Sequence, residues 1–239
     1  AVAVGGTFLI AAYHAFLFVG EQGTTSAAAA VVVSLSPILT TGFARLLLPE
    51  ERLTVLGLVG LAVGFVGVIV LSDPDPNNLG DTRTVSLFLV FLAALSFAFG
   101  SVLTRRFDDD LPIETMEAWS MVLGAALMHV ASAAASESVG DVSWTGEGLL
   151  ALGYLSLVAS AVGFLIYFDL LERLGPIAIT LVSYAAPIAA AVTGLAVLGE
   201  RPTLSTAAGF ALICVGFVFI KRRAIREELA GGAGSVPGD

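Results

Sequence analysis

Few residues in this chain can carry the chemistry of a soluble enzyme. Its 239 residues include one cysteine (Cys214), one lysine (Lys221) and two histidines. A single cysteine excludes an internal disulfide and a cysteine metal cluster, and Cys214 in its apolar run is interpreted as a packing residue. Lys221 ends an apolar segment, which excludes a buried Schiff base of the retinal type. HExxH, GxSxG and phosphate-loop motifs are also missing from the sequence, so we expect no enzyme, no metal and no cofactor.

Charge is scarce as well. Only 13% of the residues are charged and 57% are hydrophobic, and the mean hydropathy is +0.94. Soluble domains carry about 25% charged residues. The net charge of −9 comes mostly from loops and tails such as 108–110. We therefore expect a polytopic membrane protein that has lipid around it and no nucleic acid among its partners.

Eight apolar segments follow one another, and about 20 residues suffice to span a bilayer, although the first segment is short by this criterion. Turn residues separate them, including the Asp-Pro-Asp-Pro-Asn-Asn run at 73–78. The predicted fold class is an all-α polytopic membrane protein with eight transmembrane helices. Their ranges are roughly 5–20, 26–48, 54–72, 85–105, 113–135, 148–171, 176–198 and 203–221.

A block near the start of the chain returns near its end. Residues 26–67 and 176–216 both hold an apolar stretch broken by proline, a charged turn and a glycine-rich stretch. Pro37 matches Pro187 at an offset of 150 residues. Matched proline-broken segments in two halves are typical of secondary transporters and point to the substrate site. Five further pairs match at an offset of 149: Glu51/Glu200, Arg52/Arg201, Thr54/Thr203, Gly60/Gly209 and Gly67/Gly216.

The basic residues predict the orientation, because Lys and Arg are enriched in cytoplasmic loops. A cytoplasmic C-terminus leaves only Arg83 and Arg201 outside. The nine basic residues then inside are Arg45, Arg52, Arg105, Arg106, Arg173, Lys221, Arg222, Arg223 and Arg226. The two copies lie five helices apart, an odd number, so the second copy is inserted upside down relative to the first.

The same offset predicts a larger assembly of helices. Helices 85–105 and 113–135 have counterparts before residue 1, so we expect a ten-helix bundle of five plus five, of which this chain lacks the first two helices. Residues 1–72 are then the last three helices of the first repeat, and 85–223 the five helices of the second. We expect an external linker at 73–84 and a disordered cytoplasmic tail at 224–239.

The second copy reads Pro187, then Leu198-Gly199-Glu200-Arg201-Pro202-Thr203, then Gly209 and Gly216; the first copy of the charged turn is 48–54. This order and spacing, over residues 7 to 223, resemble the EamA-type permeases of the drug/metabolite transporter superfamily. The resemblance implies a multi-pass protein of the cell membrane with a ten-helix fold and cytoplasmic termini. It further implies export or exchange of small metabolites, amino-acid-like or drug-like.

The two prolines are the first candidate site residues. Each removes an amide donor in mid-helix, which leaves the Val33 and Ser183 carbonyls without helical partners. At membrane depth such backbone is tolerated only beside protein or a watery cavity, so we interpret Pro37 and Pro187 as a cavity lining with a hinge, in preference to packing kinks. Hydroxyls form a polar stripe beside them and contact either substrate or neighbouring helices. The stripe residues are Ser34, Thr180, Ser183 and Tyr184.

His14 is the other candidate, because an ionisable residue inside a membrane is expensive and usually functional. It gates by protonation, or it is a neutral histidine bonded across helices; both interpretations stay open. Glu51-Arg52 and Glu200-Arg201 are interpreted as closing tight turns at helix ends. The glycine pattern fits scaffold packing or a dimer face, so a homodimer is an open alternative. Alternatives to a transporter are a truncated non-transporting fragment and an intramembrane enzyme.

Overall fold

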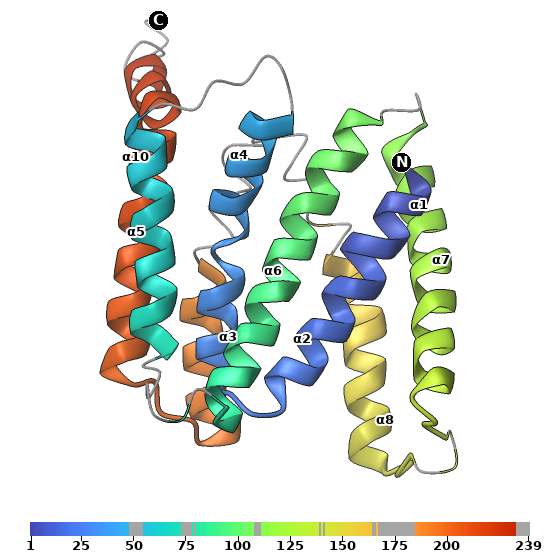
Figure 1. The fold of residues 1–239 in the computed structure, drawn as a ribbon. Coiled ribbons are helices and arrows are strands. Elements are labelled where there is room, and N and C mark those ends of the chain that lie inside the picture. Colours follow the sequence, from blue (N-terminus) through green and yellow to red (C-terminus); the bar gives the residue numbers. More distant parts are fainter. Residues whose placement is uncertain are drawn as a thin grey trace, which may run out of the picture.

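All regular structure that the computed structural model describes is helical (Figure 1). The described residues are 1–47, 55–72, 78, 80–107, 111–138, 140, 142–163, 166 and 185–232. The helices are α1 (Val2–Val4), the π-helical η1 (Gly5–Ala12), α2 (Tyr13–Glu21), α3 (Ser26–Val33), α4 (Ser36–Leu47), α5 (Val55–Ser72), α6 (Thr82–Arg106), α7 (Ile113–Ala134), α8 (Gly146–Gly153), the π-helical η3 (Tyr154–Val162) and η4 (Gly194–Leu198), and α10 (Leu204–Gly232).

Four helices within the described residues are long and apolar enough to cross a membrane: Val2–Glu21, Ser26–Leu47, Val55–Ser72 and Thr82–Arg106. The first has 20 residues, so it is longer than the short segment expected from the sequence. Shorter apolar helices cover Gly146–Ser160, Ala185–Leu198 and Leu204–Ile220. The protein is therefore an all-α polytopic membrane protein.

The C-terminal end differs from expectation. Disorder was predicted for 224–239, whereas α10 continues as a helix to Gly232. Its apolar part therefore runs directly into a charged helical extension that contains Arg226.

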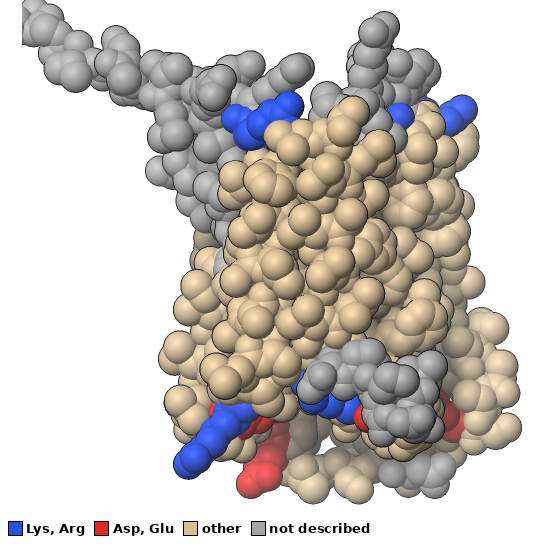
Figure 2. All heavy atoms as spheres, turned by 60° about the vertical axis from the view of Figure 1, so that its left-hand side comes forward, with Lys and Arg blue, Asp and Glu red and all other residues tan. Residues whose placement is uncertain are grey.

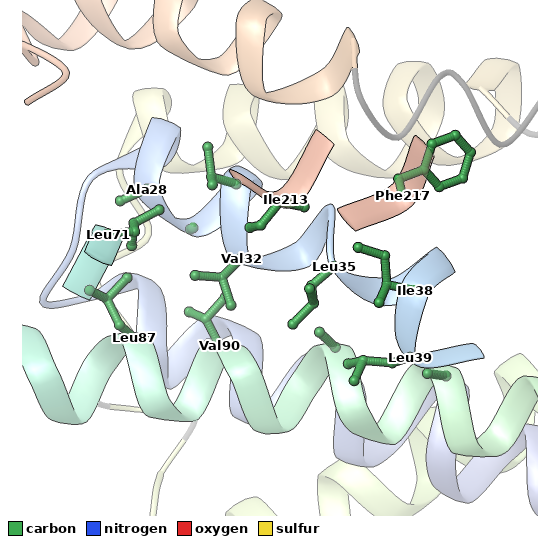
Figure 3. Packing of buried hydrophobic residues seen from close by; sticks show 14 of the residues in the cluster. Ala28, Val32, Leu35, Ile38, Leu39, Leu71, Leu87, Val90, Ile213 and Phe217 are labelled. Atoms are coloured by element: carbon green, nitrogen blue, oxygen red, sulfur yellow. The ribbon is translucent and has the colours of Figure 1, made fainter. Parts of the chain in front are cut away.

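The span formed by α3 and α4 lies at the centre of the packing. Buried residues make up 61% of its most apolar 18-residue stretch, against 11% to 44% in the other three spans. Val32, Leu35 and Ile38 of this span pack against Leu87 and other residues of α6, and against residues of α5 and α10 (Figure 3). A helix surrounded in this way presents apolar residues on all sides, which explains its nearly continuous hydrophobic sequence.

Helix α6 separates two parts of the molecule. In Figure 1 it lies between α2 and α4, and it packs against both. The span Val2–Glu21 packs between α6 and α7, where Gly6 and Gly124 allow close approach. Phe99 of α6 contacts Phe8 on one flank and Phe43 on the other, with ring centroids 5.3 Å apart in each pair.

Helices α5 and α10 form the most extensive helix pair, and glycines form its seam. A Cβ atom added to Gly60 would lie 2.5 Å from the carbonyl oxygen of Gly216, and one added to Gly216 would lie 2.5 Å from that of Gly60. Gly67 and Gly209 meet in the same way, at 2.8 and 2.6 Å. No larger residue fits at these four positions, because the obstructing atoms belong to the backbone.

These contacts are reciprocal in terms of the sequence repeat. Gly60 is equivalent to Gly209, and Gly67 to Gly216, yet each glycine touches the equivalent of the other. A two-fold axis imposes this relation: when one residue contacts the copy of a second, the second contacts the copy of the first. Helices α5 and α10 are therefore antiparallel and related by a local two-fold axis.

Charge is confined to the two ends of the face shown in Figure 2, with a band of uncharged residues between them. At the end where α4 and α6 finish, the coloured charges in view are Lys and Arg. Arg45 lies in the last turn of α4, and Arg105 and Arg106 end α6. Both signs occur at the opposite end.

Candidate functional site

The helix carrying Pro37 is interrupted where the sequence predicted a break. Helix α3 ends at Val33, a turn covers Ser34 and Leu35, and α4 begins at Ser36. The Val33 carbonyl, which cannot bond to the nitrogen of Pro37, accepts a hydrogen bond of 2.7 Å from Oγ of Ser36. A side-chain hydroxyl thus replaces the amide that proline lacks, and the break carries no energetic penalty from an unpaired acceptor at this carbonyl.

Ser34 lies beside the break but is only 1% exposed. Its Oγ donates to the Val31 carbonyl at 2.6 Å. Thr41, one turn beyond Pro37, donates in the same way to the Pro37 carbonyl at 2.8 Å. In this conformation the hydroxyls serve the backbone of their own helix. Contact between Ser34 and a substrate would require the surrounding helices to separate.

His14 lies on α2, on the other flank of α6 from Ser34 and half-buried Pro37. The structure therefore does not bring His14 together with the broken helix. Its Nδ1 donates a hydrogen bond of 2.8 Å to the Ile10 carbonyl, so Nδ1 carries a proton. Tyr13 and Phe18 pack on the imidazole, with ring centroids 4.9 and 5.5 Å away.

The second predicted cluster is described only in part. Pro187 is buried within the helix that runs from Ala185 to Leu198. Thr180, Ser183 and Tyr184 lie outside the described residues. In the part of the chain that is described, no group of three or more His, Cys, Asp and Glu residues is placed to hold a metal ion.

Glu200 connects the two halves of the chain, which the sequence did not reveal. Its Oε2 accepts a hydrogen bond of 2.9 Å from the backbone amide of Ser26, and its Oε1 one of 3.3 Å from Oγ of Ser26. Ser26 is the first residue of α3, where amides have no helical partner and the helix dipole favours a negative charge. Glu200 follows the helix that ends at Leu198, so one helix ends and the other, α3, begins at this contact.

Two glycines allow the Glu200 carboxylate to reach Ser26. Gly199 has a φ of +69°, a left-handed conformation that favours glycine and turns the chain after Leu198. The Glu200 amide then bonds the Gly194 carbonyl at 3.0 Å. A Cβ atom on Gly194 would lie 2.6 Å from Oε2 of Glu200. The Leu-Gly-Glu motif thus builds a carboxylate site for a helix of the other half, whereas its sequence was interpreted as closing its own turn.

Comparison with known proteins gives a consistent result. The EamA-like transporter family profile matches residues 1–73 and 84–222. An uncharacterised transporter of Archaeoglobus fulgidus is 30% identical over 219 residues, which cover 91% of this chain and 76% of the relative. The uncharacterised inner membrane transporter YedA of Escherichia coli is 32% identical, with 90% and 68% covered. A solved crystal structure shares the fold, with a TM-score of 0.59, 26% identity and coverage of 95% of this chain and 77% of that one.

Proposed function

Because the chain belongs to the EamA-like transporter family, we propose that this membrane protein is a secondary transporter that exports or exchanges small metabolites by alternating access. Its substrate is polar or amphipathic, amino-acid-like or drug-like. The observation that carries the mechanism is the reciprocal contact of Gly60 with Gly216 and of Gly67 with Gly209. Inverted repeats that meet at a two-fold axis give one site two equivalent ways of opening.

The proposed architecture has two repeats, residues 1–72 and 85–223, within a ten-helix bundle whose C-terminus is cytoplasmic. Support comes from the packing of Val2–Glu21 between α6 and α7. Its counterpart in the second repeat, Gly146–Val162, leaves large apolar residues such as Leu150 and Leu157 exposed by 76% and 67%. Two helices equivalent to α6 and α7 would cover that face.

The proposed transport path runs beside the helices that carry Pro37 and Pro187 and extends past α6 to His14. Its residues are those predicted from the sequence: His14, Ser34, Pro37, Thr180, Ser183, Tyr184 and Pro187. The break at Ser34 supports a bending role, because Ser36 keeps the Val33 carbonyl bonded without the proline amide. Bending at matched positions would open the path first to one side of the membrane and then to the other.

Efflux of tracer amino acids and toxic analogues from expressing cells tests the proposal. His14→Ala and Tyr184→Ala should lower efflux on the order of tenfold, the effect of losing one polar contact with substrate, and leave membrane insertion intact. The His14 hydrogen bond stays within its own helix, so its loss should not disturb packing. Val19→Ala is the matched control, because Val19 lies on the same helix and is 53% exposed.

Two results would refute this function. One is a broad panel without flux when the protein is correctly inserted. The other is a His14→Ala/Tyr184→Ala double variant that transports like the parent.

A further inference from the structure

The contact between Glu200 and Ser26 joins the two moving parts of the proposed transporter. Its two hydrogen bonds link the end of the Pro187 helix to the start of α3. Thr25 precedes this start and caps α3, its Oγ1 accepting from the Ala28 amide. The first turn of α3 is closed off beneath it, with Ala27 2% and Ala29 1% exposed. Any opening between these helices at this end must break the contact.

The opposite end lacks the residues for an equivalent contact. The repeat pairs Glu200 with Glu51 but Ser26 with Pro176, and proline has no amide hydrogen to donate. Gly199, which needs its left-handed conformation, corresponds to Glu50. Gly194, which leaves room for the Glu200 carboxylate, corresponds to Ala44 or Arg45, depending on where the offset changes from 150 to 149. The three features that build the contact are therefore present in one copy only.

We propose that Glu200 is a positioning residue for transport, a one-sided latch that keeps the outer end of the helices that carry Pro37 and Pro187 closed at rest. The inference rests on the proposed alternating-access function and on the predicted orientation, which places Glu200 outside. Opening the outer end requires Ser26 to leave the carboxylate, whereas the sequence of the other copy lacks the residues that build the same bond at the inner end. The resting protein therefore faces inward, as an exporter that collects substrate from the cytoplasm needs.

Thiol labelling with a membrane-impermeant reagent tests the latch. In a Cys214→Ala background, Ala27→Cys reports the outer end and Thr41→Cys, labelled in inverted vesicles, reports the inner end. Removing the latch with Glu200→Ala should raise labelling of Ala27→Cys from outside by about tenfold or more, because the carboxylate that accepts both hydrogen bonds is lost. Labelling of Thr41→Cys should fall in the same background, because an open outer end closes the inner one.

Variants of Ser26 separate the two hydrogen bonds. Ser26→Pro removes both donors, the amide and the hydroxyl. Proline suits the first position of a helix, and Thr25 already has the extended conformation that precedes proline (φ −83°, ψ 152°). Ser26→Pro should act like Glu200→Ala even if that variant folds poorly. Ser26→Ala keeps the amide and should have the smaller effect. Arg201→Ala, the exposed neighbouring residue, should leave both labelling reactions unchanged.

The outcomes are distinct from those of the efflux assay, since labelling needs no substrate. Unchanged labelling of Ala27→Cys in both the Glu200→Ala and Ser26→Pro proteins overturns the latch, even if the protein transports. Increased labelling at both ends shows loss of structure and also overturns it. Opposite changes at the two ends support the latch, even if no tested substrate is carried and the proposed substrates are wrong.

Discussion

The hydroxyl side chains around the helix break bond to the backbone. Ser34, Ser36 and Thr41 all donate to carbonyls of their own span. From the sequence, the Ser34 hydroxyl also fits a substrate-binding stripe. Spacing shows that residues share a helical face, but it cannot show whether a hydroxyl bonds three residues back or points into a path. The prediction that Val33 loses its helical amide partner was correct, whereas its replacement by Ser36 depends on side-chain rotamer and was not predictable.

The glycines at the seam of α5 and α10 give the clearest prediction at this scale. Gly60→Leu should impair folding, because a side chain there meets the Gly216 backbone, and overpacking costs about 1–3 kcal/mol or more. Thermal unfolding in detergent measures the effect. Gly153→Ala is the matched control: it is also a helical glycine, but its Cβ would meet nothing within 4 Å. Equal stability of the two variants would contradict the close packing described for this seam.

At the scale of elements, the helix break around Pro37 depends on two adjacent residues. Ser36→Ala should destabilise the protein by about 1 kcal/mol, because the partly buried Val33 carbonyl then has no hydrogen-bond donor. Adding Pro37→Ala supplies a backbone amide for that carbonyl and should recover most of the lost stability. Unfolding midpoints of the two single variants and the double variant measure the coupling. Simple additivity of the two changes would show that the Ser36 bond does not compensate for the proline.

Helix type and order were predictable from the sequence, and side-chain partners across the molecule were not. Runs of apolar residues located the spans that begin near Ser26, Val55 and Thr82, because each is long enough to cross a bilayer. The matched glycines predicted close packing, yet their pairing emerged only from the structure. Glu200 was assigned to its own turn, since nothing in the sequence places Ser26 beside a residue 174 positions away.

For the whole molecule, the distribution of charge predicts how it sits in the membrane. Arg105 and Arg106 end α6 at the end of the molecule where the visible charges are basic. Arg83 lies in the first turn of α6, at the other end of that helix. Cysteines introduced at 105–110 should react with impermeant reagents only from the cytoplasmic side, and cysteines at 73–81 only from outside. A cysteine at 80 in intact cells is the control for reagent access. Labelling of 105–110 from outside would contradict the predicted orientation. The latch would then close the cytoplasmic side.

The paired glycines of α5 and α10 also determine how the halves can move. Gly60 and Gly67 are two turns apart, a separation of about 10 Å along the axis. Two close backbone contacts at that spacing fix the position of α5 along α10. Sliding one helix along the other would push bulkier neighbours against the backbone, whereas a small rotation about the crossing preserves both contacts. The seam therefore favours rotation of α5 against α10 over sliding, and the proposed alternating access predicts a rocking of one repeat against the other about this seam.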